Sequence, residues 1–181
     1  LGDVYKRQVL KIIQSFINFR GQNYLSNISK PGISEKTCSR ISPHLTWGTI
    51  SSKEIIKQLN LNKINSQKNR SKINSRNLNA IKSRLSWRCH FIQKLESQPS
   101  IETSCMHPFY DQLRKNDMNL EYYKAWKEGL TGYPFIDACM RSLNYNGWIT
   151  FRMRAMLVSF ASYDLWLDWR KTGYHLSLIH I

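Results

Sequence analysis

Apolar residues recur at helical spacing along most of this chain, and no alternating pattern lasts long enough to predict a strand. The clearest stripe follows i, i+3, i+4, i+7, i+8 spacing and predicts a helix over residues 9–19: Val9, Ile12, Ile13, Phe16 and Ile17. Gly21 is suited to end this helix, and the polar stretch 22–36, with Pro31 and Gly32, predicts a loop. The pattern as a whole predicts an all-α, multi-helical architecture with short connections.

Start and stop residues delimit the other predicted helices. Ser42 and Pro43 open a short helix, since proline is tolerated in a first helical turn. The sequence from Ser51 to Glu54 forms a capping box ahead of the apolar residues that follow it. The remaining boundaries have a cap or a proline at the start and a glycine at the end: Asn119 and Gly129 around residues 120–128, and Pro134 with Gly147.

The long helix predicted over residues 78–95 carries two different stripes. One is apolar and is ordinary packing surface: Leu78, Ile81, Leu85, Cys89 and Ile92. The neighbouring stripe mixes cations with large rings at i, i+3, i+4 and i+7: Arg84, Trp87, Arg88 and Phe91. A stripe of this kind is suited to the wall of a cleft.

Other segments lack a helical pattern. Residues 63–76 contain five basic residues, no acid, and many Asn and Ser, which predicts a mobile surface loop. Residues 99–118 are irregular. The ends, 1–8 and 176–181, do not continue the patterns beside them, and we expect both to be non-native or disordered. One helical domain is thus predicted over residues 9–175.

Composition adds a strong electrostatic bias. Lys and Arg number 27 against 12 Asp and Glu, for a formal net charge of +15. This imbalance predicts attraction to polyanions, of which nucleic acid is the commonest; a basic protein without an anionic partner is the alternative.

The cysteines and the apolar runs bear on metal binding, disulfide bonds, membrane spans and the cellular compartment. The four cysteines form no CxxC pair, so we predict neither a metal site nor a disulfide framework: Cys38, Cys89, Cys105 and Cys139. No apolar run approaches the roughly 18 residues that a membrane span needs. No signal-peptide layout opens the chain, and we expect a reduced, cytoplasmic, monomeric protein.

Two places could carry chemistry. No Ser-His-Asp set, Walker loop or GxGxxG is present, so hydrolase and Rossmann functions are unsupported. At residues 36–43, hydroxyls and a cation gather at a helix start, where Ser39, Ser42 and backbone N–H groups could hold a phosphate. Ordinary helix capping is the alternative explanation of this stretch.

The second place is the apolar, aromatic stretch from Trp126 to Arg170. Arg152 and Arg154 lie within it, and a buried guanidinium without an anionic or aromatic partner is costly. Asp164 lies ten residues after Arg154, about 15 Å away on a continuous helix. We therefore expect the partner of Arg154 to come from a ligand or from chain outside this sequence.

Three ordered motifs in this stretch closely resemble the FAD-binding domain of photolyases and cryptochromes. They are W-x-x-G-x-T-G-Y-P-x-I-D-A-x-M-R-x-L from Trp126, G-W followed by R-x-R from Gly147, and D-L-x-x-D-W-R from Asp164. Upstream, C-S-R-I-S-P-H-L-x-x-G-x-I-S from Cys38 resembles the T-S-R-L-S-P-x-L-x-x-G loop of that family. Trp87 and Arg88 resemble its W-R-x-F helix. The resemblance covers residues 21–174.

The resemblance implies a U-shaped FAD held between helices. The residues it places at the phosphates and nearby groups are Tyr24, Cys38, Ser39, Arg40, Ile41 and Ser42. Those beside the flavin are Trp148, Phe151 and Arg154, where Phe151 stands at a usual Asn position. Those at the mouth that receives a flipped-out pyrimidine dimer in DNA are Trp87, Arg88 and Arg152. Trp169 matches the middle tryptophan of an electron relay that photoreduces the flavin.

The implied function is light-driven DNA repair, a carbon–carbon lyase reaction in which excited reduced FAD donates an electron to a pyrimidine dimer. A cryptochrome-like blue-light signalling flavoprotein is the alternative, and a basic nucleic-acid module without cofactor is a third class.

The chain departs from the family pattern at Cys38, where Thr is usual, at Arg84, where Glu is common, and near Asn116, where an outer relay tryptophan is expected. The domain is expected to be truncated on its C-terminal side, before the Asp-rich flavin segment, and to lack the α/β antenna domain. We therefore expect the fragment alone to be inactive in repair.

Overall fold

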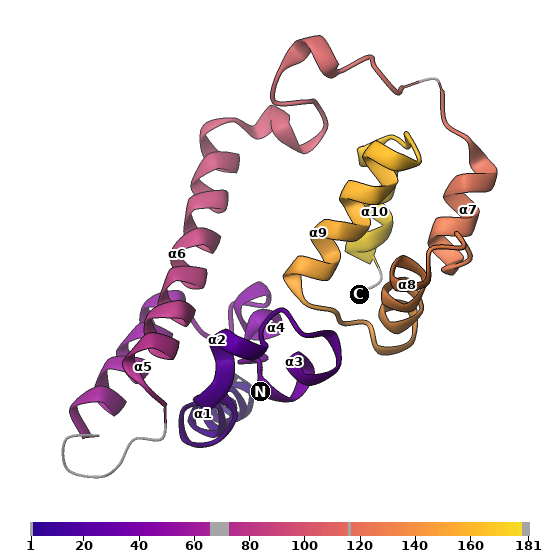
Figure 1. Cartoon of the computed structure of the whole chain (residues 1–181). Coiled ribbons are helices and arrows are strands. Elements are labelled where there is room, and N and C mark those ends of the chain that lie inside the picture. The colour runs from indigo at the N-terminus through magenta and orange to yellow at the C-terminus, as the bar shows by residue number, and fades with distance from the viewer. Residues whose placement is uncertain (1, 66–72, 116, 179–181) are drawn as a thin grey trace. The chain divides into compact units, whose positions relative to one another are not determined.

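The chain is helical throughout the parts that are described. The computed structural model describes residues 2–65, 73–115 and 117–178, and every regular element in these ranges is a helix (Figure 1). This confirms the predicted all-α class. The chain divides into two compact units, Leu1–Gln93 and Lys94–Ile181, each with its own buried cluster. None of the helices in the described ranges is long and apolar enough to cross a membrane.

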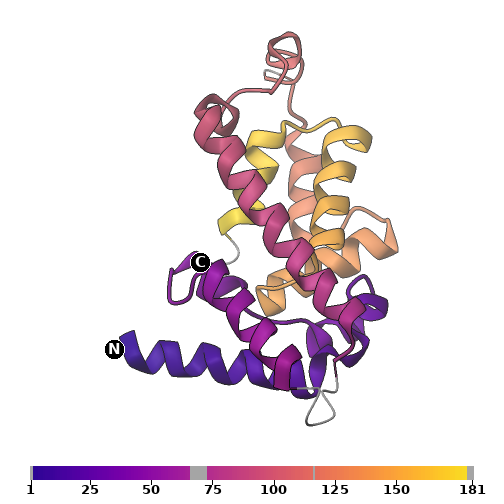
Figure 2. The same ribbon diagram turned by 90° about the vertical axis from the view of Figure 1, so that its left-hand side faces the viewer.

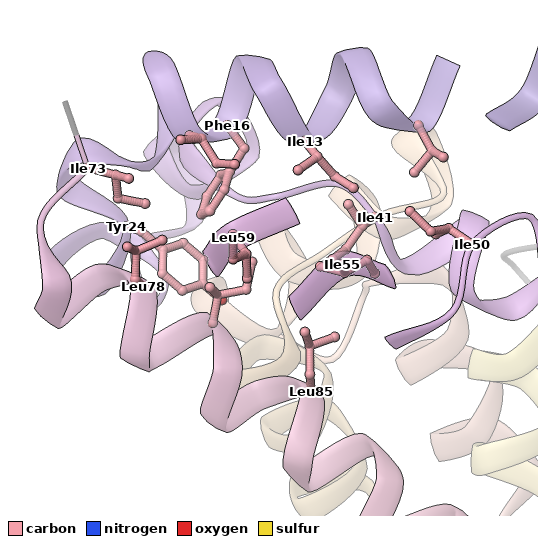
Figure 3. Packing of buried hydrophobic residues seen from close by; sticks show 13 residues of the cluster. Ile13, Phe16, Tyr24, Ile41, Ile50, Ile55, Leu59, Ile73, Leu78 and Leu85 are labelled. Carbon is pink, nitrogen blue, oxygen red and sulfur yellow. The ribbon is translucent and has the colours of Figure 1, made fainter. Parts of the chain in front are cut away.

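The first unit packs its helices around one apolar cluster. Its elements are α1 (Gly2–Asn18), η1 (Arg20–Asn23), α2 (Tyr24–Asn27), α3 (Pro31–Thr37), α4 (Ser42–Thr46), α5 (Ser52–Asn65) and the start of α6 (Ser75–Ser97). Figure 2 shows α1 in indigo over its whole length. The α1 stripe is buried at Val9, Ile13, Phe16 and Ile17. Figure 3 shows Phe16 and Ile13 of α1 facing Tyr24, Leu59 and Ile55, with Leu78 and Leu85 of α6 below them.

The predicted loop over residues 22–36 is wrong, because this stretch forms η1, α2 and α3. Proline at the start of α3 has the backbone shape that a first helical turn needs. The Tyr24 ring packs edge-on against Phe16, with ring centroids 5.3 Å apart, and Ser34 is fully buried. Tertiary packing of these few residues therefore outweighs the polar composition of the stretch.

Two further boundaries differ from the sequence pattern. α1 begins at Gly2, so most of the segment 1–8 that we expected to be non-native or disordered is helical. α10 (Trp169–Leu178) likewise runs beyond residue 175, and Leu176 is buried. Of the loop predicted over 63–76, residues 66–72 lie outside the described ranges. The prediction is wrong at its two ends, because residues 63–65 belong to α5 and residues 75–76 to α6.

The second unit holds the end of α6 and the helices that carry the three ordered motifs between Trp126 and Arg170. Its elements are η2 (Pro99–Glu102), η3 (Pro108–Tyr110), α7 (Leu120–Glu128), α8 (Pro134–Asn146), α9 (Phe151–Ser159), the π-helical turn η4 (Phe160–Asp164) and α10. Their shared cluster centres on residues with no exposed surface: Trp126, Met140, Leu143, Leu157, Ala161 and Leu167.

Local sequence signals set most helix ends. Ser51 Oγ accepts from the Glu54 N–H at 3.1 Å, and the Glu54 carboxylate accepts from the Ser51 N–H at 3.0 Å, which confirms the capping box. Asn119 caps α7 by accepting from the Tyr122 N–H at 3.0 Å. Gly129 and Gly147 end α7 and α8 in the left-handed conformation, as predicted.

Gly129→Ala should destabilise the second unit by about 2 kcal/mol. A side chain at its φ of +69° is strained, and the added Cβ would lie 2.9 Å from the Asp137 carbonyl oxygen. Gly132→Ala is the matched control, because its φ is +85° but no atom lies within 4 Å of the added Cβ. Urea unfolding followed by circular dichroism should therefore show a smaller loss for Gly132→Ala. Equal losses would mean that the close contact contributes nothing.

Candidate functional site

The first candidate region is the turn from Cys38 to Ser42, which joins α3 to α4. Ile41 is buried in the cluster of the first unit and anchors the turn from below. Cys38 and Ser39 are half-buried, whereas Arg40 and Ser42 are exposed. The turn therefore offers backbone and polar side chains to solvent while its apolar residue holds it in place.

Arg20 forms hydrogen bonds both to this turn and to α1. Its Nη1 donates to the Cys38 carbonyl, and its Nη2 donates to the Ser39 carbonyl at 3.3 Å. The same guanidinium donates to the Ile12 carbonyl at 3.0 Å and to Ser15 Oγ at 3.2 Å. One side chain thus ties two successive peptide groups of the turn to α1.

The backbone of the turn has a shape that proteins use for anions. Arg40 has a φ of +59°, and Ile41 follows with φ −93° and ψ −7°. Successive residues of opposite hand direct their N–H groups toward one concavity, which suits an anion. A non-glycine residue with positive φ costs on the order of 1–3 kcal/mol, and such strain is concentrated at functional sites.

Positive charge exceeds negative charge at this turn. The Arg40 guanidinium lies 3.8 Å from the Glu35 carboxylate, and Arg20 has carbonyl and hydroxyl partners. Burial lowers the pKa of Arg20, and repulsion from Arg40 lowers it further. Burial raises the pKa of the Cys38 thiol, while Arg40 and Arg20 act in the opposite direction. This donor set, with two cations against one carboxylate, fits the phosphates of a cofactor.

Tyr24 lies beneath the turn and not on its surface. Its ring is almost completely buried against Phe16. Burial, followed by the nearby Cys38 thiol, raises the pKa of Tyr24 to about 12. The phenol therefore stays protonated at neutral pH and supports the turn as a packed ring.

The predicted stacking residue lies on an open face of α6. Trp87 is 53% exposed, and its ring centroid lies 5.6 Å from that of His90 and 5.9 Å from that of Phe91. Arg88 is half-buried and donates to the Leu45 carbonyl of α4 at 3.3 Å. His90 was missed in the sequence, although its position three residues after Trp87 places it on the same side of the helix.

Trp148 precedes α9, and Phe151 and Arg154 lie in the first turn of that helix. Thr150 caps that helix by accepting from the Met153 N–H at 3.2 Å. Phe151 is 71% exposed and Trp148 is half-buried, so aromatic surface borders this helix start. Arg152 is also exposed.

Arg154 has a hydrogen-bond partner within this chain, while the anionic or aromatic partner expected from a ligand or from further chain stays a prediction. Its Nη1 donates to the Leu176 carbonyl of α10 at 2.9 Å, so the partner is part of this chain. Burial lowers the pKa of Arg154, although arginine stays charged at neutral pH. A carbonyl does not neutralise the guanidinium, which can still attract an anionic ligand.

Trp169 contacts both a neighbour in its own motif and a residue far from it in the chain. Its indole N–H donates to Cys105 Sγ at 3.4 Å, and the Arg170 guanidinium lies 5.0 Å from its ring centroid. Arg170 also pairs with Asp168 at 3.2 Å and with Asp111. Cys105 and Asp111 lie about 60 residues before Trp169, so only tertiary structure joins them. Within the described ranges, no three metal-ligating side chains converge.

Comparisons with known proteins point in one direction. The family model described as the FAD binding domain of DNA photolyase matches residues 81–179. The chain is 34% identical over 137 residues to a deoxyribodipyrimidine photo-lyase of Streptomyces griseus, covering 76% of this chain and 27% of that protein. It thus spans about a quarter of the length of this relative.

Two solved structures have the same fold. A crystal structure of an archaeal photolyase from Sulfolobus tokodaii with two FAD molecules is similar with a TM-score of 0.69 and 30% identity, covering 97% of this chain and 36% of that one. A cryptochrome of Synechocystis sp. PCC6803 is similar with a TM-score of 0.78 and 22% identity, covering 94% and 34%. At that identity the cryptochrome supports the fold alone.

Proposed function

Because the chain belongs to the DNA photolyase family and contains part of its FAD-binding domain, we propose that it serves in light-driven repair of pyrimidine dimers in DNA. The observation that carries this proposal furthest is the Cys38–Ser42 turn. Its opposite-handed backbone and the two cations beside it match what the phosphates of FAD require. The net charge of +15 supports the DNA partner independently.

Each group of residues has a proposed task. Cys38 to Ser42 would bind the cofactor phosphates, with Tyr24 packed below them. Trp148, Phe151 and Arg154 would border the flavin, where Arg154 adds positive charge and the rings exclude water. The chemistry supplied by bound FAD is light-driven electron donation.

The DNA side of the site uses stacking and phosphate contacts. Trp87 is exposed and can stack on an extruded base, which is worth roughly 1–3 kcal/mol per base. Arg88 and Arg152 would contact phosphates, which position the DNA. Trp169 would relay electrons toward the flavin, and its N–H contact with Cys105 fixes the orientation of the indole.

The test uses the chain with FAD and two duplexes that differ only in a thymine dimer. We expect a flavin absorbance spectrum after gel filtration and at least tenfold tighter binding of the dimer-containing duplex. Absence of flavin would overturn the cofactor assignment and favour a nucleic-acid module. Flavin without preference for the dimer would instead support a signalling flavoprotein. Repair under blue light, measured on a protein that contains this chain within a whole photolyase, completes the test.

Arg154→Ala should weaken FAD binding by roughly 10- to 100-fold, the equivalent of losing one charge-assisted contact. Arg152→Ala is the matched control. It removes the same charge two residues before Arg154, but from a side chain that is exposed. We expect Arg152→Ala to keep FAD and to weaken DNA binding. Fluorescence titration with FAD measures the first effect. Equal FAD affinity in both variants would remove Arg154 from the flavin site.

A further inference from the structure

We propose that Arg20 is a positioning residue that fixes the Cys38–Ser42 turn in its phosphate-binding shape and so favours FAD over flavins without phosphate. The inference rests on the proposed function, because that function places cofactor phosphates at the turn. Arg20 lies outside every motif that identified the family. Its contacts in the folded structure, and not its place in the sequence, identify it.

The contacts of Arg20 join two separate parts of the first unit. On one side the guanidinium binds the Ile12 carbonyl and Ser15 Oγ, both on α1. On the other side it binds the carbonyls of Cys38 and Ser39. The planar fork of arginine can hold several acceptors at fixed angles, whereas the single ammonium of lysine cannot reach all four.

The carbonyl contacts also set the direction of the N–H groups. In a trans peptide unit, the C=O of one residue and the N–H of the next point in opposite directions. Because the Cys38 and Ser39 carbonyls point at Arg20, the N–H groups of Ser39 and Arg40 point away from it. Arg20 therefore turns two successive donors toward the face opposite α1.

The charge of Arg20 assists the same task. Its four hydrogen-bond acceptors are neutral oxygen atoms, so none of these contacts cancels its positive charge with a carboxylate. Arg40 adds a second cation near it, and Glu35 is 3.8 Å from Arg40. An anion on the outer face would meet two N–H donors backed by net positive charge.

The test uses Arg20→Lys in the whole chain, which keeps the charge but loses the fork. Inorganic pyrophosphate is the probe, and the backbone amide shifts of Ser39 and Arg40 are the readout. We expect saturable shifts in the unaltered chain and about tenfold weaker binding in Arg20→Lys, with an unchanged melting temperature. Arg7→Lys on α1, an exposed arginine, is the matched control and should leave the affinity unchanged. Arg20→Gln is the second variant and should weaken binding further.

Flavin titrations separate this inference from the proposed function. We expect Arg20→Lys to lower FAD affinity and to leave riboflavin affinity unchanged, because riboflavin has no phosphate. No pyrophosphate response in the unaltered chain, or equal affinity in Arg20→Lys, would overturn the role of Arg20. Parallel losses of FAD, riboflavin and melting temperature would reduce Arg20 to a structural contact. An Arg20-dependent pyrophosphate response without FAD binding would instead overturn the proposed function alone.

Discussion

Trp126→Ala is expected to destabilise the second unit by about 3–5 kcal/mol, the usual loss for a large buried aromatic residue. Trp126 has no exposed surface, and its indole N–H donates to the Leu157 carbonyl at 3.2 Å. Its ring also meets His175 edge-on, with centroids 5.8 Å apart. Alanine would leave a cavity at the centre of the α7, α9 and α10 packing and would remove the indole donor to the Leu157 carbonyl.

Two variants make this expectation specific. Trp47→Ala removes the same side chain from a position that is 81% exposed, and it should change the free energy of unfolding by less than about 0.5 kcal/mol. Trp126→Phe keeps an aromatic ring but loses the N–H donor, so its loss should fall between the two. Urea unfolding followed by circular dichroism measures all three. A loss for Trp126→Ala no larger than that for Trp47→Ala would contradict the burial that we describe.

Asp137→Ala is expected to cost about 3 kcal/mol and to uncouple α8 from the end of α7. The Asp137 carboxylate accepts from the Thr131 N–H at 2.8 Å, from Thr131 Oγ at 2.6 Å and from the Gly132 N–H at 3.0 Å. Arg141 lies 3.9 Å away on the next turn of α8. One buried carboxylate therefore organises both the Thr131–Gly132 turn and the first turns of the helix.

The contribution of Asp137 depends on pH in a definite direction. Burial acts to raise its pKa, but the hydrogen bonds from Thr131 and Gly132, with Arg141, outweigh burial and lower it below the usual 3.8. A lowered pKa in the folded state stabilises the fold above pH 3.8, and this stabilisation is lost as pH falls through the folded value. The difference in unfolding free energy between the unaltered chain and Asp137→Asn should thus shrink between pH 6 and acidic pH.

Asp164→Ala provides the comparison, since Asp164 is an exposed carboxylate of the same unit. At pH 6 its removal should change the free energy of unfolding by less than about 0.5 kcal/mol. If Asp137→Asn loses the same free energy at pH 6 and at low pH, the ionised carboxylate is not what holds the turn.

Features encoded by neighbouring residues could be predicted from the sequence. The capping box at Ser51 and Glu54 and the cap at Asn119 form between residues three apart, so their spacing is sufficient to recognise them. Glycine ends α7 and α8 because only the left-handed conformation is needed there, and glycine adopts it without strain. The FAD-binding family was recognisable for a similar reason, since its motifs are short and ordered along the chain.

Features that depend on distant residues could not be predicted. Residues 22–36 read as a polar loop, yet Tyr24 packs on Phe16 and the stretch becomes helical. The partner of Arg154 is a backbone carbonyl at Leu176, and carbonyls have no sequence signature. Arg20 escaped notice for the same reason, because its partners on the turn are carbonyls 18 and 19 residues away. The assignment of individual residues to FAD and DNA stays a prediction that the variants above can test.

The separate buried clusters of the two units have a consequence for intrinsic tryptophan fluorescence during unfolding. Four of the six tryptophans lie in the second unit, among them the fully buried Trp126. The first unit has only Trp47 and Trp87, and both are already exposed when it is folded. Intrinsic tryptophan emission should therefore shift strongly when the second unit unfolds and only weakly when the first does. Unfolding of the first unit, which carries Arg20 and the Cys38–Ser42 turn, should therefore change the emission spectrum very little. Phe16→Trp would place a buried tryptophan in the core of this unit and make its unfolding visible in the emission.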